Sequence, residues 1–153
     1  MNDTPGNGHA RSILNSEQAW SASTNELEVD NEWLKIYMGD EERTIAGVAI
    51  QPRDDPTECY EYVTSYTVKY ANIHGREDDT WHDIPGTFTG NNTETGRGTE
   101  KGVFDNPISA RWVKIIPKTA VNWISMRAEV LLDLQTELGT EDENPTCNFI
   151  NVP

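Results

Sequence analysis

The chain has 153 residues, enough for one domain of ordinary size, and its 26 acidic residues against 12 basic ones give a formal net charge of −14. A surface with this charge repels DNA, RNA and anionic lipid headgroups at long range, so we expect no nucleic-acid partner and no docking on anionic membranes. No stretch approaches the roughly 20 consecutive apolar residues of a membrane-spanning helix.

Strand patterns begin after a polar, glycine-rich start, which predicts a flexible lead-in over residues 1–8. The first strong pattern covers residues 32–38, where apolar side chains recur at every second position. A second predicted strand, 43–51, is rich in β-branched residues and stops at the proline-rich residues 52–56, because proline lacks a ladder donor. The long segment 62–70 repeats the alternation with three tyrosines and a valine on one face.

The middle of the chain is less regular. Residues 81–88 predict a short pair of strands broken at Pro85–Gly86, and residues 90–102 predict a loop rich in Gly, Asn, Thr and Glu. Residues 110–116 then predict a strand that Pro117 stops.

The last predicted strand is 123–132, and the acidic residues 134–153 beyond it predict a loose tail. No segment combines helix caps with an apolar stripe. Short strands separated by Gly, Pro and Asn turns predict an all-β fold, an antiparallel β-sandwich or barrel.

Six segments, in order and spread over residues 9 to 132, resemble the discoidin family, also called the coagulation factor V/VIII type C domain. The resemblance implies a distorted jelly-roll barrel over residues 9–133 whose loops at one end bind the ligand, without catalysis. The six segments are 15–22, 32–36, 47–51, 62–70, 108–117 and 124–130.

The chain departs from this family in its cysteines. Members usually begin with a strand whose cysteine bridges to one just after the last strand. Here that leading strand is missing and Cys147 lies well past residue 130, so we expect no such bridge. Pairing of Cys147 with Cys59 stays open. We expect residues 146–152 to cover the vacant sheet edge, in the same chain or in a neighbouring copy of a homo-oligomer.

The resemblance places the loops around residues 7–9, 15–19 and 52–62 at the binding end, with 118–123 near them. These loops carry carboxylates, a guanidinium group and aromatic rings, which suit the hydroxyls and the apolar face of a sugar; solvated loops are the alternative. Trp20 and Trp33 are expected to pack in the core. The predicted ligand-binding residues are Asn15, Glu17, Arg53, Asp54, Asp55, Glu58, Tyr60 and Trp123.

Enzymatic motifs are lacking: the chain has no Gly-x-Ser-x-Gly elbow, P-loop, GxGxxG or HExxH. We therefore expect no catalysis and no cofactor, although calcium stays open at oxygen-rich positions such as Asp54–Asp55.

The expected function is a recognition module that binds a galactose-type or related glycan in cell adhesion or surface recognition. A protein-binding adhesion module with a collagen-like or receptor partner is the alternative, and a phosphatidylserine-binding module fits less well. We expect the protein at the cell surface or outside the cell, either released without a leader after cytoplasmic storage or as part of a longer secreted chain.

Overall fold

The computed structural model describes residues 12–24, 32–54, 60–72, 80–92 and 98–133, and this part of the chain forms strands and no helix. All its ladders are antiparallel, which confirms the predicted all-β fold. The strands are β1 (Trp20–Ser21), β2 (Leu34–Tyr37), β3 (Arg43–Gln51), β4 (Tyr62–Ala71), β5 (His82–Thr89), β6 (Glu100–Ala110), β7 (Trp112–Val121) and β8 (Ser125–Leu132). Within these described ranges no helix has the length and apolarity that a membrane crossing requires.

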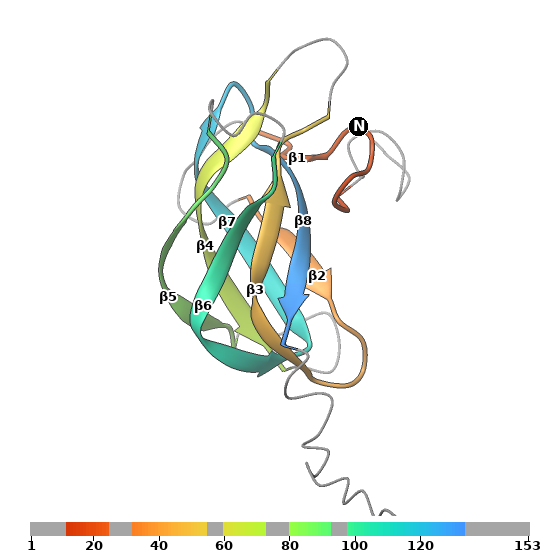
Figure 1. The fold of residues 1–153 in the computed structure, drawn as a ribbon, viewed down its shortest axis with the longest axis vertical. Helices are drawn as coiled ribbons and strands as arrows, with labels where there is room; N and C mark the ends of the chain where they lie inside the picture. Colours follow the sequence, from red (N-terminus) through yellow and green to blue (C-terminus); the bar gives the residue numbers. More distant parts are fainter. Residues whose placement is uncertain (1–11, 25–31, 55–59, 73–79, 93–97, 134–153) are drawn as a thin grey trace, which may run out of the picture.

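The strands form two four-stranded sheets, in the orders β1-β8-β3-β6 and β2-β7-β4-β5. Figure 1 shows the first sheet in front of the second. The core lies between them, because alternate side chains of each strand point to the opposite sheet. One row of the second sheet is apolar and buried from edge to edge, and its directly opposite members are Leu34, Ile115, Val68 and Ile84.

The ends of four strands gather at the upper end of the sandwich in Figure 1. There β3 ends and β4 begins, while β7 ends and β8 begins, and β1 lies beside β8. The described parts of the loops 15–19, 52–62 and 118–123 therefore meet at this end, which we call the loop end, while residues 7–9 lie outside the described residues.

Two predicted breaks at prolines are wrong. Strand β7 continues through Pro117 to Val121. Among the described residues, the ladder between β7 and β2 ends at Ile115. Pro117 therefore lies where the described partner of β7 is β4, and a missing N–H on the other side costs little. Strand β5 continues through Pro85–Gly86, and a change of register between its pairs with Tyr66 and Val68 accommodates both residues.

The predicted loop over residues 90–102 is partly wrong, and strand β6 was missed. β6 begins at Glu100, and β3 is its one partner among the described strands, so Pro107 lies in an edge strand of that sheet. The register shifts between Ile45, opposite Ile108, and Gly47, opposite Val103. This irregularity accommodates Pro107. It also interrupts the alternation of apolar residues that would have identified β6 as a strand in the sequence.

The two tryptophans expected in the core differ in burial. Trp20 packs against the buried cluster, whereas 41% of Trp33 is exposed, so its predicted core position is wrong. Asp55, Glu58, both cysteines and the tail lie outside the described residues.

Candidate functional site

Hydrogen bonds tie three separate stretches of chain together at the loop end. The backbone N–H of Gln18 donates to the carbonyl of Asp54 (3.0 Å), and the N–H of Asp54 donates back to Gln18 (3.3 Å). The N–H of Arg53 also donates to the carbonyl of Glu61 at 3.1 Å. The loop before β1 is therefore fixed to the end of β3, and the end of β3 to the start of β4.

Arg53 lies at the centre of this connection. Its Nη1 donates to Glu61 Oε2 at 2.9 Å, while Nε and Nη2 donate to Gln18 Oε1 at 2.9 and 2.7 Å. Only 15% of the Arg53 side chain and 17% of the Glu61 side chain are exposed, so this ion pair is less screened than a surface pair. Arg53 thus positions the loops through bonds inside the protein.

The same Glu61 oxygen connects the site to β8 and β1. Ser125 Oγ donates to Glu61 Oε2 at 2.8 Å, and Ser125 Oγ lies 2.8 Å from Ser21 Oγ. Ser125 is buried, so this hydroxyl chain satisfies polar atoms that water does not reach.

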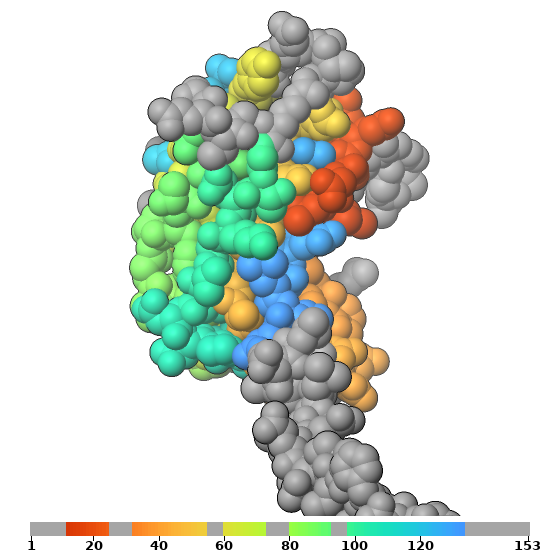
Figure 2. Space-filling model, viewed as in Figure 1, coloured from red at the N-terminus to blue at the C-terminus, as the bar shows by residue number. Residues whose placement is uncertain are grey.

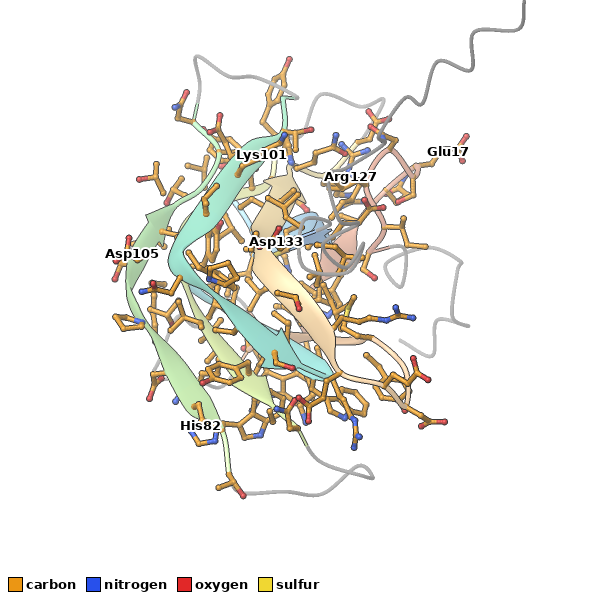
Figure 3. The ribbon with its side chains drawn as sticks, turned by 60° about the horizontal axis from the view of Figure 1, so that its bottom comes forward. Glu17, His82, Lys101, Asp105, Arg127 and Asp133 are labelled. Atoms are coloured by element: carbon orange, nitrogen blue, oxygen red, sulfur yellow. The ribbon has the colours of Figure 1, made fainter. Side chains whose placement is uncertain are left out.

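Beneath the surface, a buried arginine supports the loops. Arg127 of β8 donates from Nε to the Pro52 carbonyl at 2.9 Å and from Nη1 to the Ser16 carbonyl at 2.7 Å. Gln51 does the same for Asn15, since its Oε1 accepts from the Asn15 N–H and its Nε2 donates to Asn15 Oδ1. Met126 and Ala128 point into the core, so Arg127 between them points to the other face of the sheet, where Figure 3 shows it on the same side of the molecule as Glu17, whose side chain points outward.

Two aromatic rings are exposed on this scaffold. Tyr60 is 52% exposed and Trp123 is 37% exposed. Asn122 Nδ2 donates to the Tyr60 carbonyl at 2.7 Å, and Trp123 Nε1 donates to the Ala22 carbonyl at 3.1 Å. The bond from its indole N–H fixes Trp123, and part of its ring surface stays open to a ligand.

The backbone at the loop end carries local strain. Among the described non-glycine residues, positive φ angles occur at Asn15 (62°), Gln18 (65°) and Asn122 (61°) only. Such angles are uncommon outside glycine, and strained residues gather at functional sites. All three lie beside the exposed rings or in the loop tied to Arg53.

The structure brings the described predicted residues to one end: Asn15, Glu17, Arg53, Asp54, Tyr60 and Trp123. The sequence did not single out the residues that hold them. Gln18, Glu61 and Ser125 lie up to 107 positions apart, from 18 to 125, so no local spacing relates them. They become neighbours through the pairing of β1 with β8, the bridge between Gln18 and Asp54, and the connection from β3 in one sheet to β4 in the other.

Other features of the described residues lie apart from this end. No three His, Cys, Asp or Glu side chains gather closely enough to hold a metal ion within the ranges that the structure covers. A shallow hollow lies between edge strands β5 and β6, where Figure 3 shows Asp105, and Tyr70 and Phe104 are among its lining residues. The hollow includes none of the predicted ligand-binding residues.

Comparisons with known proteins agree with this architecture. The chain matches the F5/8 type C domain over residues 2–130. It is 33% identical to bovine lactadherin over an alignment of 120 residues, which covers 74% of this chain and 26% of lactadherin. The chain therefore spans about a quarter of that relative's length.

Solved structures share the fold. Discoidin II of Dictyostelium discoideum superposes with a TM-score of 0.61 at 24% identity, covering 78% of this chain and 47% of that one. The chitosan-binding module 1 of a chitosanase/glucanase from Paenibacillus sp. IK-5 gives a TM-score of 0.52 at 19% identity, covering 80% and 83%.

Proposed function

Because this chain belongs to the F5/8 type C domain family, we propose that it is a non-enzymatic recognition module that binds carbohydrate through its loop end. The observation that carries the proposal is the pair of exposed rings, Tyr60 and Trp123, on loops held by the Arg53–Glu61 ion pair. A rigid scaffold of this kind keeps a binding surface in place before the ligand arrives.

The chemistry of the loop end suits a sugar. An exposed aromatic face packs against the apolar face of a sugar ring, while nearby carboxylates accept hydrogen bonds from its hydroxyls. Glu17 and Asp54 supply carboxylates among the described residues, and Asp55 and Glu58 follow in the sequence. Because these groups are acidic, we expect neutral or amino sugars, with galactose-type glycans first.

The fold offers a precedent, since the solved module from Paenibacillus is named for binding chitosan. A surface glycan would place the protein outside the cell or at the cell surface, in adhesion or surface recognition. Calcium, if it takes part, would act at the oxygen-rich loop around Asp54.

A glycan array with and without calcium tests the proposal. The variants Trp123→Ala and Tyr60→Ala should each weaken binding to the selected glycan at least about tenfold, which corresponds to about 1.4 kcal/mol. Val103→Ala is the matched control, because Val103 is 63% exposed on β6 and lies outside the loop end.

The proposal fails if no glycan binds under either condition, or if both aromatic variants bind as well as the unmodified protein. Retention on collagen without any glycan signal would favour the protein-binding alternative. Binding that disappears only in chelator would identify calcium as a cofactor.

A further inference from the structure

The outer face of the second sheet carries a row of lysines. Lys35 of β2 lies directly opposite Lys114 of β7, and Lys114 lies directly opposite Lys69 of β4. Residues directly opposite in a ladder share one face, and their neighbours Leu34, Ile115 and Val68 point into the core, so the lysines point outward. Three of the chain's five lysines thus meet in one row of an acidic protein.

Two tryptophans frame the first two lysines. Lys35 Nζ lies 4.4 Å from the ring centroid of Trp33 and 5.4 Å from that of Trp81. Lys114 Nζ lies 4.0 Å from the Trp81 centroid and 5.6 Å from the Trp33 centroid. Both ammonium groups therefore share the same two indole rings, and Trp33 remains 41% exposed. We call Trp33, Lys35, Trp81 and Lys114 the lysine–tryptophan cluster.

The indole rings hold two like charges side by side. Like charges directly opposite in a sheet are destabilising, and the four cation–π contacts, at about 0.5–1 kcal/mol each, offset that repulsion. At the end of the row, Asp83 of β5 lies 3.3 Å from Lys69 and lowers the local charge there. Lys35 and Lys114 thus bring two ammonium groups together between the two indoles.

We propose that the lysine–tryptophan cluster is a second binding surface, which takes a sulfated saccharide. An ammonium group has three donors, and contact with an indole face does not use all of them, so the pair can donate to a sulfate placed over it. The exposed face of Trp33 offers a platform for the sugar ring that carries the sulfate.

The cluster is separate from the loop end in position and in chemistry. Lys69 and Lys114 pair near the end of β4 and the start of β7, whereas the loop end holds the start of β4 and the end of β7. The loop end is acidic and suits neutral or amino sugars, while this face suits an anion. The two surfaces would let one module distinguish a sulfated from an unsulfated glycan.

Calorimetric titration of the whole chain with a chondroitin sulfate oligosaccharide tests the inference, with its desulfated counterpart and inorganic sulfate as comparison probes. We expect binding of the sulfated oligosaccharide that weakens as salt is raised, and at least a tenfold loss in Lys35→Gln/Lys114→Gln. Lys35→Arg/Lys114→Arg should retain binding, because it keeps the charge and the ring contacts. Lys101→Gln is a control for charge on the other sheet, and circular dichroism confirms that each variant is folded.

Trp33→Ala and Trp123→Ala separate the two surfaces. Trp33→Ala should weaken the sulfated probe and leave the glycan of the loop end unaffected, and Trp123→Ala should do the reverse. The inference is overturned if the sulfated oligosaccharide does not bind at low salt, or if Lys101→Gln loses as much affinity as the double variant. Equal affinity for the desulfated probe overturns it too, as does lysine-dependent binding to phosphatidylserine vesicles, which would make the face a membrane surface.

Discussion

Tyr66 carries a hydroxyl that is enclosed in the core without a hydrogen-bond partner among the described residues. The ring of Tyr66 stacks on Phe88 at 5.5 Å between centroids, and the hydroxyl lies close to Gly102 of β6. A Cβ at position 102 would overlap this hydroxyl and lie 2.9 Å from Phe88, so glycine is required for the close approach. Burial first, and the charge of Glu100 second, raise the pKa of Tyr66 well above its ordinary value.

This raised pKa predicts a loss of stability in alkali. Above about pH 10 the unfolded chain releases the Tyr66 proton while the folded protein retains it, so the stability present below that pH falls as pH rises, by about 1.4 kcal/mol per unit. Tyr66→Phe should therefore gain about 1.4 kcal/mol over the unmodified protein between pH 8 and pH 11. Urea unfolding at both pH values measures the difference. The other four tyrosines are present in both the variant and the unmodified protein, so their titration cancels in the comparison. The prediction is contradicted if the free energy of unfolding changes equally in both proteins between pH 8 and pH 11.

At the scale of single residues, the sequence predicted which residues share the loop end, but it did not predict the bonds that hold each of them there. Arg53 and Trp123 were predicted from residue type and from the resemblance to a loop-binding family. Their bonds depend on partners distant in the chain, since Arg53 reaches Gln18 and Trp123 reaches Ala22. The predicted core position of Trp33 is wrong. A tryptophan at the start of a strand can pack in the core or against lysines on the outer face, and the sequence alone does not distinguish the two.

At the scale of strands, proline misled the sequence analysis because its cost depends on the neighbouring strand. Pro107 and Pro117 lie where one side of the strand has no paired neighbour, as the described ladders show. A single sequence gives the alternation of strands such as 62–70 but not which strand lies at an edge. The interior strands β3 and β4 were therefore predicted closely, while β6 was missed.

Arg127 links three elements, and its removal should loosen the loop end. Arg127→Ala removes two charge-assisted bonds and leaves the Ser16 and Pro52 carbonyls without this donor, so we expect a loss of about 3 kcal/mol in the free energy of unfolding. Hydrogen exchange should become faster over residues 12–18 than in strand β4. Lys101→Ala, an exposed change on β6, should alter neither quantity by much. Uniform acceleration across both segments would show that Arg127 acts on the whole fold instead.

At the scale of the molecule, the charge of −14 hides an uneven distribution. The composition predicted repulsion of nucleic acids and anionic membranes, and it could not reveal a local row of lysines. Lys35, Lys69 and Lys114 are separated by more than thirty positions each, and only the register of β2, β7 and β4 brings them together. The composition describes the long-range electrostatic field of the protein, whereas the pairing of strands determines which charged side chains a bound ligand would contact.

The long-range field leads to a prediction for membranes. Liposomes rich in phosphatidylserine should not retain the protein at physiological salt, because the net charge opposes their approach. Ile13, Tyr60 and Trp123 are exposed near the loop end among the described residues, but the charged side chains of these loops are mostly acidic, which opposes docking on an anionic lipid surface. The lysine–tryptophan cluster lies on a sheet face and has two ammonium groups. Physiological salt screens their attraction to anionic lipid.

Co-sedimentation with phosphatidylserine and with phosphatidylcholine liposomes checks this expectation, each with calcium and with chelator. Retention on phosphatidylserine only in calcium would show that the ion bridges carboxylates of the loop end to lipid phosphate, and Trp123→Ala should then reduce it. Retention that persists in chelator would contradict the prediction, because no bridging ion would remain to reverse the charge. Lys35→Gln/Lys114→Gln identifies the responsible surface in that case: a loss of retention would assign it to the outer sheet face, and unchanged retention would assign it to the loops.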